Sequence, residues 1–61
     1  MTPYLCIATF QKSAIEVRTR VEARHILEAE EKAKKKVRAM FTEDENKRLG
    51  EVFIECRRMK E

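Results

Sequence analysis

The sequence predicts an α+β fold of the type strand–strand–helix–strand (ββαβ), in which one helix covers one face of a three-stranded antiparallel sheet. Three observations predict it: residues 14–23 alternate in polarity, residues 26–41 carry one apolar stripe with helical spacing, and residues 51–59 alternate again. Strands place successive side chains on opposite faces, whereas helices bring residues three and four apart together. With only 61 residues, the chain is expected to form a single small domain over 1–61.

The first two strands are expected to form a hairpin. Residues 4–11 are an uncharged run rich in strand-forming types, and Lys12 and Ser13 separate them from residues 14–23. A two-residue loop fixes the register, which predicts the pairs Phe10–Ile15, Ala8–Val17, Cys6–Thr19 and Tyr4–Val21. Lys-Ser suits the usual hairpin turns poorly, so a longer loop with the pairing displaced by whole pairs is the alternative. The inward face of the second strand would carry Ile15, Val17, Thr19, Val21 and Ala23.

Residues 26–41 are expected to form the helix that covers the sheet. The apolar positions recur every three or four residues and form one stripe, made of Ile26, Ala29, Ala33, Val37 and Met40. The alanines lie in the middle of this stripe, so the helix can approach the sheet closely. Because no preferred capping residue precedes the helix, Arg24 or His25 must serve as its N-cap.

Residues 42–50 form a charged connector between the helix and the last strand. Thr42 and Glu45 have the spacing of a capping box, and Gly50 suits the position after a helix end. The sequence leaves two interpretations open here, a short second helix and a solvated loop.

The first strand is expected to lie in the centre of the sheet. A right-handed crossover makes the last strand parallel to the second, and residues 4–11 carry no charge whereas both other strands do. The sheet would then be fully antiparallel with the order second–first–third (2-1-3). The inward side of the last strand would carry Val52, Ile54 and Cys56.

Cys6 and Cys56 both fall on the predicted inward face, on neighbouring strands. We expect two reduced, buried thiols that pack as small apolar groups, with a disulfide as the alternative. No apolar run approaches the 18 or so residues needed to span a membrane, and the short apolar stretch after Met1 lacks the basic lead of a signal peptide. A cytoplasmic location, in which thiols stay reduced, is therefore expected.

The sequence contains no constellation of catalytic, cofactor-binding or metal-binding residues. His25 is the only histidine, and with two cysteines it falls short of the four ligands of a typical zinc site. Gly50 is the only glycine, which excludes the glycine-rich loops that cradle phosphates. We therefore expect a protein that is not an enzyme and that carries no cofactor.

The stretch from Arg24 to Phe41, which contains the predicted helix, accounts for the whole net charge of +3; the chain has 14 basic and 11 acidic residues. Several of its acids precede a base by four residues, as Glu28 precedes Lys32, so we expect these charges to pair largely with one another. The alternative is a weak contact with nucleic acid, because few phosphates could be neutralised. The residues for such a contact would be Lys32, Lys34, Lys35 and Arg38.

The sheet face turned away from the helix is expected to expose an apolar patch made of Leu5, Ile7, Phe53 and Met59. Such a patch on an uncovered sheet indicates docking of a partner or of a second copy. Arginines beside an aromatic ring are typical of binding hot spots, and short strand edges can pair with a partner strand. The residues expected to bind a partner protein are Arg18, Arg20, Phe53, Arg57 and Arg58.

Several short segments carry a resemblance to known families, namely Ala14-Ile15-Glu16-Val17, Glu28-Ala29 and Glu51-Val52. In this pattern the chain resembles the small RNA polymerase inhibitor made by short-tailed coliphages. The resemblance implies inhibition of a host enzyme through arginines of the last strand, where this chain has Arg57 and Arg58, later in the strand. Val21-Glu22-Ala23 followed by Glu28-Ala29 is also similar to a small archaeal large-subunit ribosomal protein, which would imply RNA binding.

The sequence thus predicts a small regulatory protein that acts by binding another protein. The expected type is a phage inhibitor of a host nucleic-acid-processing enzyme such as RNA polymerase, acting in transcription regulation. A chain this short often gains burial from a second copy, so a homodimer through the sheet face or edge is a further expectation. The alternative function is a small basic module that binds DNA or RNA.

Overall fold

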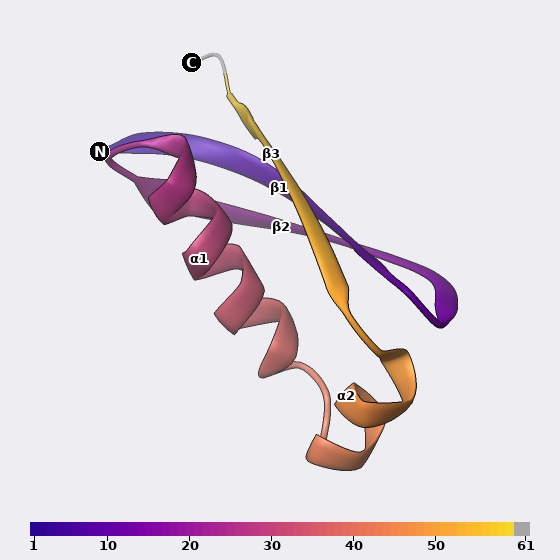
Figure 1. The fold of residues 1–61 in the computed structure, drawn as a ribbon. Helices are drawn as coiled ribbons and strands as arrows, with labels where there is room; N and C mark the ends of the chain where they lie inside the picture. Colours follow the sequence, from indigo (N-terminus) through magenta and orange to yellow (C-terminus); the bar gives the residue numbers. More distant parts are fainter. Residues whose placement is uncertain (60–61) are drawn as a thin grey trace.

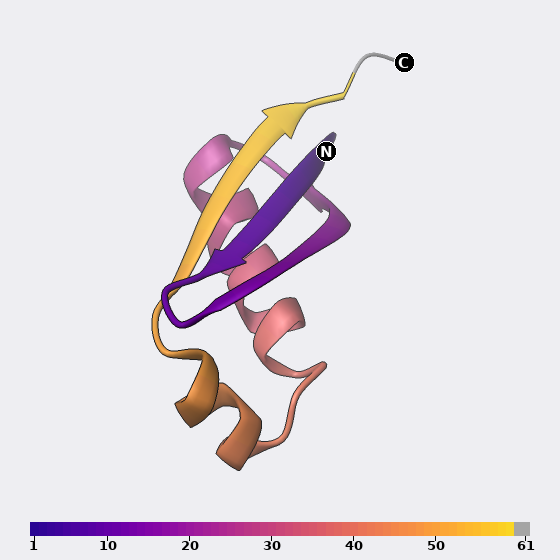
Figure 2. The same cartoon turned by 90° about the vertical axis from the view of Figure 1, so that its right-hand side faces the viewer.

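The computed structural model describes residues 1–59 and arranges them as one helix layer on a three-stranded sheet (Figure 1). Along the chain follow β1 (Thr2–Phe10), β2 (Ser13–Ala23), α1 (Ile26–Arg38), α2 (Glu43–Leu49) and β3 (Val52–Arg58). The strands lie in the order β2-β1-β3 with both pairs antiparallel, and Figure 2 shows β1 between its neighbours. The predicted α+β fold and the central place of the first strand are confirmed.

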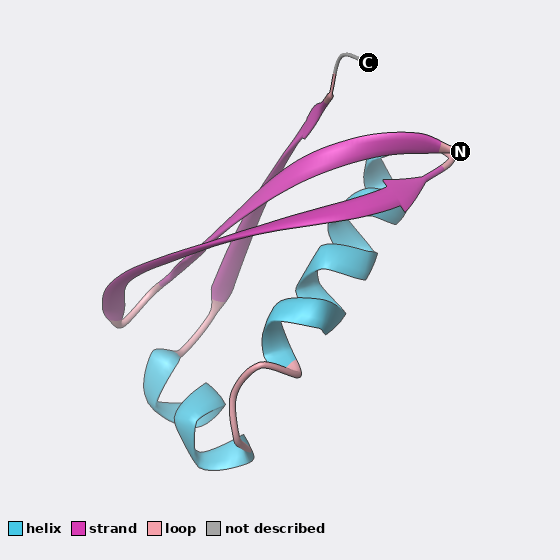
Figure 3. Cartoon of the chain, turned by 180° about the vertical axis from the view of Figure 1, so that it is seen from behind, coloured by secondary structure: helices cyan, strands magenta, loops and turns pink. Residues whose placement is uncertain are grey.

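The hairpin register is confirmed over most of its length and differs at the turn. Tyr4, Cys6 and Ala8 pair with the predicted partners, but Phe10 lies opposite Ser13 instead of Ile15. The register shifts between Thr9 and Phe10, since two extra residues of β2 form an irregularity at the bend. Figures 1 and 3 show the hairpin tip lying away from α1. Ile15, expected to face the core, is consequently 49% exposed.

Strand β3 pairs with the other side of β1. Cys56 lies opposite Cys6, Ile54 opposite Ala8 and Val52 opposite Phe10. Ile54 and Val52 pack against the buried core and Cys56 belongs to it, which confirms the predicted inward side of this strand. Two backbone hydrogen bonds continue the ladder at its ends, from Gln11 N to Glu51 O and from Met59 N to Pro3 O.

Helix α1 covers the inner face of the sheet with three fully buried side chains, Ala29, Ala33 and Val37. His25 is its N-cap, since the Nδ1 atom accepts a hydrogen bond from the Glu28 backbone N–H at 3.2 Å. The helix ends at Arg38, three residues earlier than predicted. The predictions that Ile26 and Met40 belong to the buried stripe are wrong, because both lie at or beyond the ends of the helix and are exposed.

Helix α2 resolves the alternative that the sequence left open for residues 42–50. The complete capping box is present, with the Thr42 side chain accepting from Glu45 N and the Glu45 carboxylate accepting from Thr42 N. Gly50 ends the helix with a φ of 75°, a conformation that favours glycine. Leu49 is the buried residue of this helix and packs with Ala8, Phe10 and Val37.

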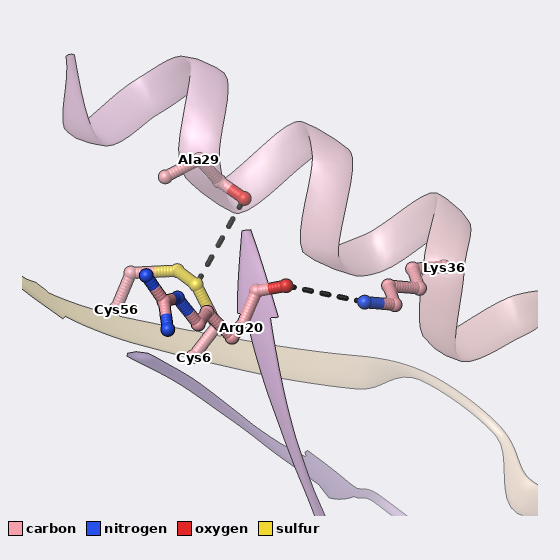
Figure 4. Close-up of a disulfide and its surroundings, with 5 residues drawn as sticks. All are labelled: Cys6, Arg20, Ala29, Lys36 and Cys56. Carbon is pink, nitrogen blue, oxygen red and sulfur yellow. Dashed lines mark hydrogen bonds between the residues drawn. A yellow bond between two sulfur atoms is a disulfide. The ribbon is translucent and has the colours of Figure 1, made fainter. Parts of the chain in front are cut away.

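The core contains a disulfide between Cys6 and Cys56, which Figure 4 shows beneath α1. The prediction of two reduced thiols is therefore wrong, although both residues are buried as expected. The physical reason is the register: the two cysteines are direct partners across β1 and β3, with a Cα–Cα distance of 4.0 Å. Disulfides typically bridge Cα atoms a few ångströms apart.

Within residues 1–59, neither helix has the length and the apolar character needed to cross a membrane.

Candidate functional site

The outer face of the sheet, defined as the face opposite α1, is uncovered by any described helix. Figures 2 and 3 show both helices away from this face. Strand alternation places Leu5 and Ile7 of β1 on it, and both are partly exposed. Phe53 of β3 lies on the same face and is 52% exposed. The uncovered apolar surface that the sequence predicted is thus present around the central strand.

Pairing across the three strands arranges the outer face in rows. Leu5 lies opposite Arg20 on one side and opposite Arg57 on the other. The next row places Ile7 between Arg18 and Glu55, and the row after it places Thr9 between Glu16 and Phe53. Neighbouring strands are about 4.8 Å apart, so the backbones of Arg20 and Arg57 lie roughly 10 Å apart across Leu5.

Two of the arginines on this face form exposed ion pairs with acids of their own strands. Arg18 Nε lies 3.1 Å from Glu16 Oε1, and Arg57 Nη2 lies 3.6 Å from Glu55 Oε1. All four side chains are largely exposed to solvent, where such pairs contribute little. A partner carboxylate can therefore compete for both guanidinium groups.

The structure brings together four of the five residues expected to bind a partner protein. Arg18, Arg20, Phe53 and Arg57 share the outer face. Arg58 does not join them, because it pairs with Tyr4, whose side chain belongs to the core under α1. Arg58 therefore lies on the helix side of the sheet, and it is exposed to solvent because it is the last residue of β3.

The basic residues of α1 differ in what they contact. Lys32 Nζ donates to Glu22 O at 2.7 Å, and Lys36 Nζ donates to Arg20 O at 3.1 Å (Figure 4). Arg38 binds the α2 end through Asn46 Oδ1 and Gly50 O, both at 3.1 Å. Within residues 1–59, the side chains of Lys34 and Lys35 have no hydrogen-bond partner. Of the residues considered for nucleic acid, two therefore have intramolecular roles that the sequence did not reveal.

The start of α1 is held by a reciprocal pair of hydrogen bonds. The Glu28 carboxylate accepts from Arg24 N at 3.3 Å, while the backbone N–H of Glu28 donates to His25. The bond from Arg24 N, together with the nearby ammonium of Lys32, lowers the pKa of Glu28 below its ordinary value of 4.5. His25 is thus occupied as a helix cap.

No group of three His, Cys, Asp or Glu side chains among residues 1–59 lies close enough together to hold a metal ion. Comparison of the chain with protein-family models, with curated proteins and with solved structures finds no match. The outer face therefore stands as the candidate site on its geometry alone.

Proposed function

We propose that this chain is a small, non-enzymatic regulatory protein that binds another protein through the outer face of its sheet. The observation that carries the proposal is the row in which Leu5 lies between Arg20 and Arg57, with Phe53 half-exposed on the same face two rows further along. Interface hot spots are enriched in arginine and aromatic residues that surround an apolar centre.

The arrangement favours a partner surface that is acidic at its rim and apolar at its centre. Arg20 and Arg57 can each receive a carboxylate, and guanidinium groups bind carboxylates in a bidentate manner. Leu5 and Ile7 between them offer apolar contact. Glu55, which pairs with Arg57, would have to release this arginine on binding.

The resemblance to the phage RNA polymerase inhibitor gives this proposal a narrower form. In that form the partner is a host nucleic-acid-processing enzyme, and the protein regulates transcription by occupying its surface. Arg57 is the last-strand arginine on the outer face, and so it is the residue that would make the inhibitory contact.

Nucleic-acid binding is the second candidate function, and the exposed Lys34 and Lys35 favour it. Lys32 and Arg38 support it less, because each donates to backbone carbonyls of this chain. Titration with duplex and single-stranded oligonucleotides from low to about 0.15 M salt tests it, since exposed charges are then screened over about 8 Å. We expect weak binding that disappears as salt rises, and tight binding at the upper salt concentration would place this function first.

A cytoplasmic location belongs to the proposal, and the Cys6–Cys56 disulfide weighs against it. The thiol pools of the cytoplasm keep most cysteine pairs reduced. Alkylation of thiols in intact producing cells, before lysis, tests the compartment. Two alkylated cysteines support the cytoplasm, whereas protected cysteines that become reactive only after reduction support an oxidising compartment.

The binding proposal is tested by capture from nuclease-treated lysate of the producing cell, followed by affinity measurement with the captured protein. Charge reversal by Arg20→Glu should weaken this affinity at least tenfold, because it places an acid in the row around Leu5. Lys47→Glu on α2 is the matched control with the same charge change, and it should leave the affinity unchanged. Equal affinities of the two variants would exclude the outer face as the binding surface.

A further inference from the structure

The two edges of the sheet differ in how their backbone groups are covered. Strand β2 forms one edge and β3 the other, because β1 lies between them. An uncovered strand edge is a template for pairing with another strand, and natural proteins commonly protect it with lysine side chains. The edge of β2 is protected in this way, whereas the edge of β3 is not.

Two lysines of α1 cover the β2 edge. Lys32 Nζ donates to Glu22 O and Lys36 Nζ to Arg20 O, at 2.7 and 3.1 Å. Glu22 and Arg20 lie opposite β1 residues in non-hydrogen-bonded pairs, so their carbonyl groups point outward from the sheet. A further strand added to β2 would have to displace both ammonium groups.

The backbone groups of the β3 edge can be assigned from its ladder with β1. Glu51 O and Met59 N bond to β1 or its continuation, at Gln11 N and Pro3 O. Hydrogen-bonding direction alternates along a strand, so the odd-numbered residues between them face β1. The outward-facing groups then belong to Val52, Ile54, Cys56 and Arg58. Among residues 1–59, no side chain forms a hydrogen bond with these groups.

A groove of about 390 Å³ runs beside this bare edge, between α1 and β3. Its apolar lining comes from Leu27 of the helix and from Val52 and Ile54 of the strand, and its polar lining from Glu30, Glu31 and Lys34. Leu27 is 66% exposed, and Ile54, which packs against the core, is only partly buried. The helix therefore leaves apolar surface uncovered on the side where the edge is open.

We propose that β3 pairs with β3 of a second copy, antiparallel, about a two-fold axis at Ile54, which joins the two sheets into one. In this register Ile54 faces its own counterpart and Val52 faces Cys56 of the other copy, so the three central pairs on the helix side are apolar. Arg58 lies opposite Gly50 of the other copy at each end of the pairing. On the outer face, Glu51 of each copy lies opposite Arg57 of the other. A two-fold interface must be self-complementary; the central apolar pairs and the two Glu51–Arg57 pairs meet that condition, and Phe53 lies opposite Glu55 between them.

The neighbouring registers are disfavoured by charge. The N–H and C=O groups of Val52, Ile54 and Cys56 point toward the second copy and must form the hydrogen bonds between the two β3 strands. The two-fold axis can therefore shift only to registers that keep these residues hydrogen-bonded. One such shift places Glu55 opposite Glu55 of the other copy, and the shift in the other direction places Glu51 opposite Glu55. Like charges directly opposite one another destabilise a strand pair. The dimer does not depend on the proposed binding at the outer face, although it places Glu51 of the other copy opposite Arg57 of that face.

Charge exchange between positions 51 and 57 tests the register. The self-association constant of the unaltered chain is measured by analytical ultracentrifugation over a range of concentrations, with the variants Glu51→Lys and Arg57→Glu beside it. Each variant alone places like charges opposite one another twice, and we expect dimerisation to weaken roughly tenfold. An equimolar mixture of the two variants restores opposite charges at both positions and should recover dimers. Within one chain the two residues lie too far apart along the strand to pair.

Hydrogen exchange gives a second readout that requires no substitution. The Ile54 amide should become protected as protein concentration rises, while the outward-facing Arg20 amide on the β2 edge is the matched control and should not. A chain that stays monomeric at every concentration overturns the proposal and leaves the β3 edge to a strand of another protein. A dimer whose association is unaffected by both charge variants, or whose Ile54 amide stays unprotected, also overturns it, because another surface then forms the contact.

Discussion

The Cys6–Cys56 disulfide ties the central strand to an edge strand and closes most of the chain into one loop, because the two residues are 50 positions apart. Both cysteines are buried, and Cys6 Sγ lies 4.0 Å from the Ala29 carbonyl oxygen of α1. A chain of this length buries only about 60% of its unfolded surface. A covalent link therefore represents a large share of what stabilises this fold.

Reduction of the disulfide should lower the free energy of unfolding by up to about 4 kcal/mol, the loop-entropy value for a closed loop of this length. Denaturant unfolding with and without reductant measures the change. The double variant Cys6→Ala/Cys56→Ala serves as the control, and reductant should not change its free energy of unfolding. Coinciding unfolding curves of the oxidised and reduced chain would show that the link contributes nothing.

The cysteine pair also shows what a single sequence can predict at the level of a residue. The alternation of polar and apolar residues placed Cys6 and Cys56 on the buried face, because the face to which a side chain points depends only on its position within its own strand. Their direct opposition depends on the register between β1 and β3. No tight turn fixes that register, since α1 and α2 separate β3 from the hairpin. The oxidation state was instead inferred from the expected compartment, and that inference was wrong.

The boundary between α1 and α2 depends on contacts that the periodic pattern does not contain. The pattern continued through Met40 and Phe41, but their backbone N–H groups bond to residues three positions earlier and close a tight turn. Asn46 Nδ2 donates to Arg38 O at 3.0 Å and to Phe41 O at 3.3 Å. The end of α1 is thus satisfied by a side chain eight residues away, which apolar spacing cannot reveal.

Arg38 should contribute to stability through its bonds to α2. Arg38→Met keeps the length of the side chain and removes the donors to Asn46 Oδ1 and Gly50 O, so unfolding free energy should fall by about 1–3 kcal/mol. Lys35→Met on the exposed side of the same helix is the control, with an expected change within about 0.5 kcal/mol. Urea unfolding measures the stability of both variants. Equal unfolding midpoints of the two would mean that the hydrogen bonds of Arg38 add no stability.

The capping box of α2 should make stability depend on pH. The hydrogen bond from Thr42 N lowers the pKa of Glu45 below its ordinary value of 4.5. A carboxyl with a lowered folded-state pKa stabilises above its unfolded value, and this contribution disappears as pH falls through the folded value. Acidification from about pH 5 downward should therefore weaken α2.

Glu45→Gln isolates this contribution, because the amide oxygen still accepts from Thr42 N but carries no charge. The difference in unfolding midpoint between the unaltered chain and this variant should shrink from pH 6 to pH 3. Glu28 titrates in the same direction in both chains and cancels from the difference. A gap that stays constant across this range would show that the charge of Glu45 has no part in capping.

For the molecule as a whole, the sequence predicted the layers correctly and left the edges undetermined. The alternation of β2 and β3 and the apolar stripe of α1 indicate which side of each element is buried, and the uncovered face follows from them. The strand order follows from the right-handed crossover and from the absence of charge in the first strand. The contacts of Lys32 and Lys36 with β2 could not be predicted, because they depend on where α1 lies across the sheet. The same placement leaves the β3 edge bare.

Because the core lies on only one face of the sheet, Phe10 and Phe53 should differ in how much each contributes to stability. Phe10 is 5% exposed and packs edge to face on Phe41, with ring centroids 5.7 Å apart. Phe53 lies opposite Thr9, the residue before Phe10 in β1, so it points to the outer face; it is 52% exposed. Phe10→Ala should cost about 3–5 kcal/mol of unfolding free energy, a loss that approaches the whole stability of a small domain.

Phe53→Ala should cost less than about 1 kcal/mol, since its side chain contributes little to the core. Thermal unfolding followed by circular dichroism measures both variants under the same conditions. The charged variant Phe53→Glu should likewise stay folded while losing the interactions of the outer face, because Val52, Ile54 and Cys56 keep the inward packing of β3. If Phe53→Ala instead lowers stability as much as Phe10→Ala, the outer face is a second packing surface and its apolar side chains are there for the fold.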